Sequence, residues 1–420
     1  MNTTFCAADI LLPAKADMEK WAVAACDQYT GEPEYWARVE KRVGDSPSTL
    51  GLILPEVYLE EPDVDKRIDD IHENMRDMLE SGFFSYYSDA MLYIERVQSD
   101  GMVRRGIVGA IDLEQYDYHA GSSSLVRATE ATVPERIPPR LKVRMGAQIE
   151  LPHVLVLIDD PEKTVIEPCK AIRERRKPVY DTPLMEGAGR IKGWLLDREL
   201  KEQLSGALDR LNNNEEFNRR YGISGYPTLL FAVGDGNHSL ATAKEYYERL
   251  KAANPGKDLS NHPARYALAE IVNLHSSAIR FEAIQRIVMG VDTEKFMREA
   301  EQTLGFGGDP TSQRVISVIK GSERLSYIHK RTSELSVGSL QDFIDGYIAK
   351  NGGKVDYIHG ADVVKQLSRR DNTVGFILPD MQKSELFRTV IKDGALPRKT
   401  FSMGHAADKR FYMEARRIDR

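Results

Sequence analysis

Gly234-Asp235-Gly236-Asn237-His238-Ser239 is a short polar turn that follows an apolar run at residues 228–233. After the turn, apolar residues recur at the spacing of one helix face, at Leu240, Ala243, Tyr247 and Leu250. The stretch therefore predicts a strand, a tight turn and a helix. The first N–H groups of a helix lack partners inside the helix and carry partial positive charge, so a glycine-rich entry lets a phosphate approach them. This turn is the best candidate for an active site in the chain.

The side chains of the turn suit phosphoryl transfer. The two glycines permit close approach of a ligand to the backbone. Asn237 and Ser239 supply an amide and a hydroxyl, and His238 can donate a hydrogen bond or take up a proton near neutral pH. Asp235 can hold Mg²⁺ or orient the histidine. The structural alternative is equally open on spacing alone: Asp235 makes the turn, Asn237 or Ser239 caps the helix, and His238 lies at the surface.

Composition indicates a globular protein without a membrane span. The chain has 420 residues, of which 41% are hydrophobic and 29% charged, and no stretch approaches the ~20 apolar residues of a membrane helix. The N-terminus lacks a basic region followed by an apolar segment, so we expect a cytoplasmic protein without a secretory signal. The formal net charge of −6 disfavours nucleic-acid binding.

Cysteine spacing and missing motifs argue against several common kinds of site. Cys6, Cys26 and Cys169 are scattered and never spaced as CxxC, which argues against a disulfide framework and a structural zinc site. The sequence has no GxxxxGK[ST] nucleotide loop, no HExxH metal helix and no GxSxG nucleophile elbow. An enzyme with this sequence therefore belongs to a less common class.

Alternating helical and strand patterns predict a mixed α/β (α+β) fold. Residues 63–81 have helical periodicity, and residues 91–97 and 103–113 have the pattern of paired strands. A strand at 151–158 is followed by a predicted helix at 162–175, which Asp160 caps and Pro161 starts. A longer helix is predicted at 198–219. We expect three regions: an N-terminal α/β region at 1–150, a region with the turn at 151–290, and a C-terminal α/β region at 291–420.

Five blocks of the sequence carry a family resemblance, at residues 25–29, 127–132, 235–243, 281–286 and 396–401. In this order they resemble blocks of the bacterial and archaeal family called domain of unknown function 1015, and the similarity extends over nearly the whole chain. The family's central motif is usually of the type DGHHRYxxA. Here Asn237 replaces the first histidine and Ser239 replaces the arginine. The turn therefore lacks the permanently charged guanidinium group with which an arginine would contact phosphate.

The turn also resembles that of the ParB/sulfiredoxin superfamily, which includes nucleotide-dependent free serine kinases, sulfiredoxin and CTP-binding chromosome-partitioning proteins. The resemblance implies a ParB/sulfiredoxin-like core elaborated by additional mixed sheets and helices, with nucleotide phosphates held at the turn. It implies an enzyme of serine metabolism that acts on O-phosphoserine or serine, as a phosphatase or as a nucleotide-dependent kinase. The alternative is a ParB-like nucleotide-binding regulatory protein that turns over no small molecule.

On this resemblance, Asp27, Asp235 and His238 are the expected catalytic residues, with Asp27 as the base for a serine hydroxyl or a water. Phosphate or nucleotide contacts are expected from Gly234, Gly236, Asn237, Ser239, Arg127, Arg286, Arg398 and Lys399. Mg²⁺ is expected at Asp235, and ADP, ATP or another nucleotide is expected as donor or acceptor. The partners are then a small phosphorylated substrate and a nucleotide, without nucleic acid or membrane, and a homo-oligomer stays open.

Each of these outlying residues also has a structural alternative. Asp27 suits a turn or a helix end, where aspartate is common. Arg127 and Arg286 suit internal ion pairs. Arg398 and Lys399 suit a solvated surface loop, because most exposed charge clusters are no more than that.

Overall fold

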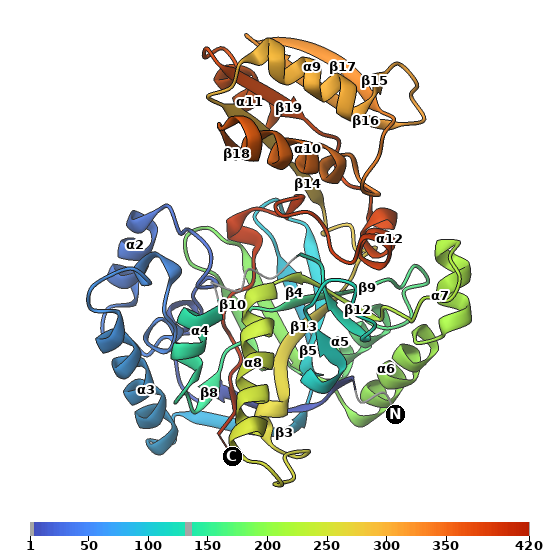
Figure 1. Ribbon diagram of the computed structural model, residues 1–420. Helices are drawn as coiled ribbons and strands as arrows, with labels where there is room; N and C mark the ends of the chain where they lie inside the picture. Colours follow the sequence, from blue (N-terminus) through green and yellow to red (C-terminus); the bar gives the residue numbers. More distant parts are fainter. Residues whose placement is uncertain (1–3, 131–136, 420) are drawn as a thin grey trace. The chain divides into compact units, whose positions relative to one another are not determined.

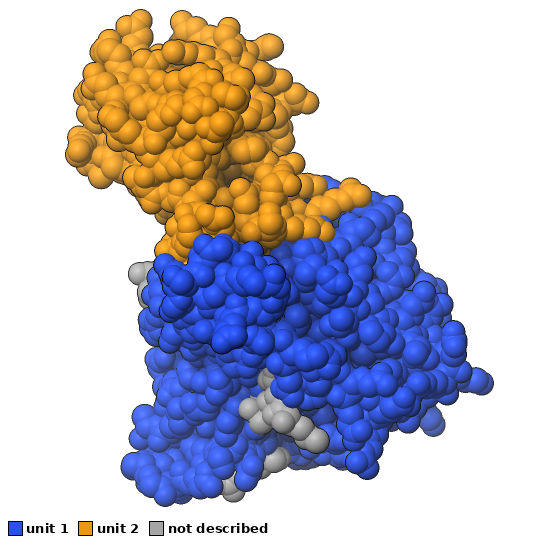
Figure 2. All heavy atoms as spheres, turned by 90° about the vertical axis from the view of Figure 1, so that its right-hand side faces the viewer, with its two compact units in different colours: residues 1–128, 132–279, 405–420 blue, residues 129–131, 280–404 orange. Residues whose placement is uncertain are grey.

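The structure, a computed structural model, describes residues 4–130 and 137–419, and the chain divides into two compact units. Unit 1 contains residues 1–128, 132–279 and 405–420, and unit 2 contains residues 129–131 and 280–404; Figure 2 colours them blue and orange. The chain therefore leaves unit 1, forms unit 2 and returns to unit 1. The three regions expected from the sequence stay a prediction. Residues 131 and 132 of the block at 127–132 lie outside the described residues.

A large mixed sheet forms the centre of unit 1 (Figure 1). Its strands in spatial order are β10 (Tyr180–Pro183), β11 (Arg190–Leu195), β4 (Leu92–Val97), β5 (Val103–Asp112), β13 (Tyr266–Asn273), β9 (Leu155–Ile158), β12 (Phe231–Asp235), β7 (Val126–Ala128) and β6 (Tyr116–Asp117), and β1 (Phe5–Cys6) pairs with β5. β9 and β13 run parallel, whereas β12 runs antiparallel to β9. The mixed α/β class expected from the sequence is confirmed.

Two small strand pairs and a set of helices complete unit 1. The pairs are β2 (Ala8–Pro13) with β3 (Phe84–Ala90), and β8 (Ile149–Glu150) with β21 (Arg416–Arg417). The helices are α1 (Met18–Trp21), α2 (Pro33–Val43), α3 (Val64–Glu80), α4 (Ile137–Arg144), α5 (Ile172–Arg175), α6 (Arg198–Leu211), α7 (Asn214–Tyr221) and α8 (Asn237–Ala253). α4 and α8 pack side by side (Figure 1).

Alternate residues of the central strands contribute to two apolar cores. Ile107 of β5 belongs to one cluster and its neighbour Val108 to the other. This period-two alternation is typical of a strand that is buried on both faces. Helices supply the opposing side chains: Leu240 of α8 is buried in the first cluster and Trp36 of α2 in the second. The apolar helix face that the sequence predicts after the turn therefore packs into the core.

Two of the predicted helices differ from the structure. The helix expected at 162–175 is wrong over most of its length, because a loop leads to a 3₁₀ segment at Glu167–Ala171 and only then to α5. Pro168 explains the break, since a residue before proline is disfavoured in the helical region. Asp160 instead caps the loop by accepting the N–H groups of Thr164 and Val165. The helix expected at 198–219 is divided into α6 and α7, and the Asn213 side chain caps α7.

Unit 2 has its own antiparallel sheet and helices. The strands in spatial order are β15 (Phe306–Gly307), β17 (Ser322–Ile328), β16 (Gln313–Ile319), β19 (Thr373–Ile377), β14 (Phe281–Met289) and β18 (Lys354–His359), and β20 (Phe401–Met403) pairs with β14. The helices are α9 (Thr293–Leu304), α10 (Ser336–Asn351), α11 (Ala361–Leu367) and α12 (Lys383–Asp393). Across the described ranges of both units, no helix has the length and apolar character needed to cross a membrane.

The last described residues, 405–419, form a segment of unit 1 that we call the C-terminal strap. Its backbone accepts a hydrogen bond from Ala25 N–H at the Arg410 carbonyl (3.0 Å) and donates one from Tyr412 to the Val23 carbonyl (2.9 Å). Arg410 is almost completely buried and pairs with Glu270 and Glu414. The strap is therefore fixed beside residues 22–26, which places its side chains next to the predicted Asp27.

Candidate active site in unit 1

The turn has the predicted strand–turn–helix geometry. β12 ends at Asp235, α8 begins at Asn237, and Gly236 between them adopts φ 74° and ψ 26°. This left-handed conformation suits glycine. A Cβ atom at Gly236 would also lie 3.0 Å from the Val154 Cα atom, so the close packing of the turn against the loop before β9 requires glycine. Gly236 has no side chain that could cap α8, and the positive end of this 17-residue helix faces the turn.

Asp235 lies beside a cation that the sequence prediction missed. One carboxylate oxygen of Asp235 accepts the Gly236 N–H at 3.0 Å, and the other lies 3.2 Å from Nζ of Lys409. Both side chains are partly buried. Lys409 comes from the C-terminal strap, far from Asp235 in the sequence, so no local spacing could have indicated the pair. The strap therefore supplies positive charge at the helix N-terminus, where the turn itself lacks an arginine.

The predicted Mg²⁺ site at Asp235 has little support in the donor set. Magnesium usually takes one or two carboxylates together with substrate phosphates and several waters. Here both Asp235 oxygens already have protein partners, and the Lys409 ammonium already neutralises the carboxylate charge that a magnesium ion would need. Within the described residues, no group of three or more His, Cys, Asp or Glu side chains is arranged to hold a metal ion. Magnesium at Asp235 stays a prediction, and no chemical step proposed for this site uses it.

Ser239 takes part in a hydrogen-bond chain instead of capping α8. Its Oγ lies 2.7 Å from Nε2 of His153, and Nδ1 of His153 lies 2.8 Å from the Tyr412 hydroxyl. That hydroxyl also accepts the Cys26 N–H at 3.1 Å. His153 and Tyr412 are buried, whereas Ser239 is partly exposed. Three distant parts of the sequence thus meet at the start of α8. The sequence prediction missed His153 and Tyr412.

Asp27 lies within the same group of side chains. Its Oδ1 accepts a hydrogen bond from the Gln28 amide at 3.0 Å. Burial raises the pKa of Asp27, but the electrostatic effect of His153, the Gln28 hydrogen bond and the charges of Lys409 and Arg140 outweigh burial, so its pKa lies below the ordinary value. A lowered pKa keeps the carboxylate ionised at neutral pH. Asp27 therefore interacts electrostatically with His153 and Lys409, which contact Ser239 and Asp235 of the turn. The catalytic role of Asp27 stays a prediction.

Asn237 and His238 lie at the first turn of α8. The Asn237 amide donates to the Val233 carbonyl at 3.4 Å, and only 9% of the Asn237 surface is exposed. His238 is partly buried, and its carbonyl accepts the Thr242 hydroxyl at 2.7 Å. The roles predicted for these two residues, phosphate contact and catalysis, stay predictions.

Arg127 lies in unit 1 but donates to backbone carbonyls. Its Nε binds the Ser124 carbonyl at 2.7 Å, and its Nη2 lies 3.1 Å and 3.2 Å from the carbonyls of Pro227 and Thr228. Burial lowers the pKa of the guanidinium to about 10. These contacts join β7 to the segment before β12, which is a structural role. Phosphate binding by Arg127 stays a prediction.

Arg286, Arg398 and Lys399 belong to unit 2, not to the unit that carries the turn. Arg286 is fully buried and donates to the Gln341 side chain and to the carbonyls of Ile284, Arg398 and Lys399. Arg398 is largely exposed and pairs with Asp345 at 3.1 Å. Arg286 thus fixes the loop that contains the other two cations. Their predicted contacts with phosphate stay predictions.

A cavity of about 150 Å³ opens beside Ser239 in unit 1. Its polar lining includes Cys26, Arg140, His153, Ser239 and Tyr412, and its apolar lining includes Leu54, Met75 and Leu240. Arg140 forms an ion pair with Glu56 across the lining. The cavity gives a small ligand access to the Ser239–His153 pair.

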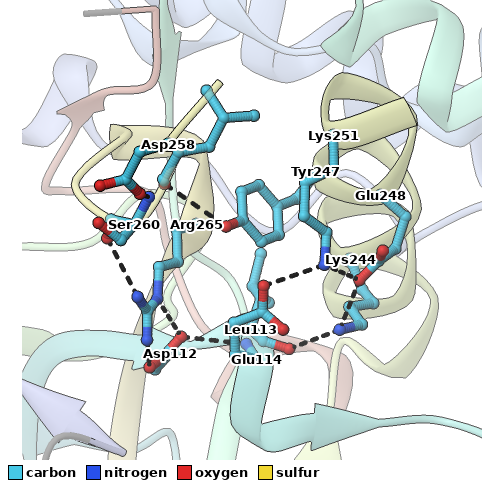
Figure 3. A network of polar contacts seen from close by, with 11 residues as sticks. Asp112, Leu113, Glu114, Lys244, Tyr247, Glu248, Lys251, Asp258, Ser260 and Arg265 are labelled. Carbon is cyan, nitrogen blue, oxygen red and sulfur yellow. Dashed lines mark hydrogen bonds and ion pairs between the residues drawn. The ribbon is translucent and has the colours of Figure 1, made fainter. Parts of the chain in front are cut away.

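The second half of α8 is anchored by a network of surface ion pairs and hydrogen bonds, the α8 anchor, which Figure 3 shows. Lys244 and Lys251 of α8 both pair with Glu248, and Lys251 also reaches Glu114 at 2.9 Å. The Lys244 ammonium donates to the Leu113 carbonyl at 2.9 Å. The network joins α8 to the segment after β5, so the helix that carries Ser239 is held at a fixed position on the sheet.

Comparison with known proteins concerns the whole chain. The family model described as protein of unknown function (DUF1015) matches residues 9–367. No curated protein matches the sequence. Among solved structures, free serine kinase in complex with AMP is 10% identical, with a TM-score of 0.38, over 72% of this chain and 90% of that chain.

Two further solved structures have similar scores. SbnI with a C-terminal truncation from Staphylococcus aureus is 10% identical, with a TM-score of 0.36, over 71% of this chain and 82% of that chain. A conserved hypothetical protein from Pyrococcus furiosus is 9% identical, with a TM-score of 0.36, over 74% and 94% of the two chains. Likenesses this distant assign no role to any residue. Because the family model matches most of its length, the chain belongs to the family of proteins of unknown function called DUF1015.

Proposed function

We propose that this protein is a phosphoryl-transfer enzyme of serine metabolism, acting on O-phosphoserine or serine as a phosphatase or as a nucleotide-dependent kinase. One observation carries the proposal: His153 and Lys409 contact Ser239 and Asp235 at the N-terminus of α8, and both act electrostatically on Asp27 within unit 1. Phosphoryl transfer needs positive charge around the phosphate and a group that moves a proton at the attacking or leaving oxygen. The serine part of the proposal comes from the sequence resemblance to the ParB/sulfiredoxin superfamily.

Each group has a chemical role in this proposal. Lys409 and the positive end of α8 hold the phosphate oxygens, and Asp235 orients Lys409. Asp27, ionised at neutral pH, accepts the proton of the attacking oxygen, which belongs to water in a phosphatase or to the serine hydroxyl in a kinase. His238 remains a second candidate for proton transfer at the turn. A nucleotide such as ADP or ATP is the acceptor or donor in the kinase reaction.

The test follows three products at once. The purified full-length protein is incubated with O-phosphoserine, with and without ADP and Mg²⁺, and phosphate, ATP and serine are measured. Phosphate and serine without ATP mean a phosphatase, and ATP with serine means a reversible kinase. Tight nucleotide binding without any turnover would instead support a ParB-like regulatory protein and contradict the enzyme.

The Asp27→Asn variant tests the site itself. It keeps the shape of the side chain but removes the base, so turnover should fall by about 10²–10⁴-fold. Asp63→Asn is the matched control, because Asp63 is an exposed aspartate of unit 1 that pairs with Arg67 in the next helical turn. Full activity of Asp27→Asn would remove Asp27 from the mechanism.

A further inference from the structure

The Ser239–His153–Tyr412 chain has the arrangement of an activated nucleophile. In such sites a hydroxyl lies within hydrogen-bond reach of a base, and a third group orients the base. Here Ser239 Oγ lies 2.7 Å from His153 Nε2, and Tyr412 Oη lies 2.8 Å from His153 Nδ1. The Cys26 N–H fixes the Tyr412 hydroxyl in turn. Thr242, one turn after Ser239, instead bonds to the helix backbone at the His238 carbonyl.

His153 is held rigidly in the position of the base. Only 7% of its surface is exposed, and its ring meets the Tyr412 ring edge-on, with centroids 5.6 Å apart. Gly236 allows the turn to lie against the segment that carries His153, because a Cβ atom there would lie 3.0 Å from the Cα atom of the next residue, Val154. The carbonyl of the preceding Pro152 accepts a hydrogen bond from buried Arg410. These contacts keep the imidazole aimed at Ser239.

Ser239 is also accessible to a ligand and lies where negative charge is stabilised. It is partly exposed and lines the cavity together with His153. Its place in the first turn of α8 puts an anion on Oγ at the positive end of the helix. Asp27 acts electrostatically on His153, so its carboxylate stabilises the imidazolium that forms when His153 takes a proton.

We infer that Ser239 is the nucleophile of the enzyme and carries the phosphoryl group as a covalent intermediate. In the first step, Ser239 Oγ attacks phosphorus, an Oγ–P bond forms, and the bond from phosphorus to the donor oxygen breaks. His153 Nε2 takes the hydroxyl proton and returns it to the departing oxygen of serine or of the nucleotide. In the second step, the oxygen of water or of a second acceptor attacks phosphorus, a new O–P bond forms and the Oγ–P bond breaks. Asp27 takes the acceptor's proton and releases it to solvent, and Ser239 Oγ takes a proton from solvent, so the Ser239 hydroxyl is restored.

This inference rests on the proposed function, and its test is a trapping experiment. The full-length protein is mixed with ³²P-labelled O-phosphoserine or with γ-³²P-ATP, quenched in acid and digested, and the labelled peptide is identified by mass spectrometry. We expect label on Ser239, and addition of unlabelled acceptor before the quench should discharge it. Turnover is measured in the same samples.

Two variants test the inference, and a third is their control. Ser239→Ala should lose the label and at least about 100-fold in turnover, and His153→Asn should slow labelling of Ser239 to a similar extent. Ser122→Ala is the control, because the Ser122 hydroxyl contacts the Ser124 N–H and the Asp117 carboxylate in a local turn and lies outside the cavity lining. Unfolding midpoints of all variants show whether each one is folded.

The outcomes separate the inference from the proposed function. Wild-type turnover without label, together with full activity of folded Ser239→Ala, overturns the covalent step and leaves phosphoryl transfer standing. Label on Ser239 without release of product supports the nucleophile while contradicting turnover of serine or O-phosphoserine. Neither label nor turnover in the wild type overturns both.

Discussion

Lys409 of unit 1 and Arg286 of unit 2 have different kinds of partner. In unit 1, Lys409 lies 3.2 Å from the Asp235 carboxylate and acts on the nearby Asp27. In unit 2, Arg286 directs its N–H groups to the Gln341 side chain and to backbone carbonyls. A cation beside carboxylates at a helix N-terminus can turn to an incoming anion, whereas an arginine that holds backbone carbonyls maintains the fold. The groups that already accept hydrogen bonds from a buried cation therefore indicate whether the cation belongs to a binding site or maintains the fold.

The largest expected effect comes from the framework that positions the site of unit 1. Arg410→Ala leaves Glu270 and Glu414 buried without their shared cation, because Arg410 pairs with both. Removing one member of a buried ion network destabilises a protein by about 3–5 kcal/mol. We expect a loss of this size in the free energy of unfolding, measured by urea titration and circular dichroism.

Arg198→Ala is the control for this variant. Arg198 also pairs with a glutamate four residues later, but 90% of its side-chain surface is exposed, so no measurable change is expected. If Arg410→Ala unfolded at the same urea concentration as the control, the strap would not depend on its ion network.

The second prediction tests the framework role of Arg286 in unit 2. Arg286→Lys replaces a planar fork by a single ammonium, which cannot reach both Gln341 and the carbonyls of the loop at 398–399. We expect the free energy of unfolding to fall by about 1–3 kcal/mol, since buried acceptors lose their donors. Limited proteolysis should cut the loop at 397–400 faster than in the wild type.

Kinetic measurements test whether Arg286 maintains the fold or binds phosphate. A framework role predicts that Arg286→Lys leaves the KM for O-phosphoserine unchanged while stability falls. The reverse result, an increased KM with unchanged stability, would restore the sequence prediction that Arg286 binds phosphate.

The sequence predicted local structure better than it predicted partners. The strand, turn and helix around Gly236 and the helix α3 follow from periodicity and glycine, which act over a few residues. Lys409 and His153 follow no local pattern, because their positions depend on how the C-terminal strap lies beside residues 22–26. The sequence shows that Arg286 is charged, but not that backbone carbonyls accept its N–H groups. Lys409 and His153, which reach the turn only through tertiary packing, therefore escaped the prediction.

The third prediction concerns the cation of unit 1. Lys409→Met removes the charge beside Asp235 but keeps a side chain of similar length. If Lys409 holds the phosphate, the KM for O-phosphoserine should rise about tenfold, which corresponds to about 1.4 kcal/mol of binding. Lys251→Met is the control, because Lys251 pairs with Glu114 and Glu248 in the α8 anchor (Figure 3). An unchanged KM in Lys409→Met would place the phosphate elsewhere.

The smallest expected effect is a pH dependence that reports on Asp27. The pKa of Asp27 is lowered in the folded protein, because the charges and the hydrogen bond around it outweigh burial, which acts in the opposite direction. Its ionisation therefore stabilises the fold above the unfolded pKa of about 3.9, and this contribution is lost as the pH falls through the folded value. Wild type should be more stable than Asp27→Asn at about pH 6, and the difference should shrink as the pH falls below the unfolded pKa of about 3.9. Urea unfolding of both proteins across this range measures the difference. A difference that stayed constant with pH would mean that His153 and Lys409 do not lower the pKa of Asp27. It would contradict the electrostatic grouping of these three residues, on which the comparison with Arg286 of unit 2 depends.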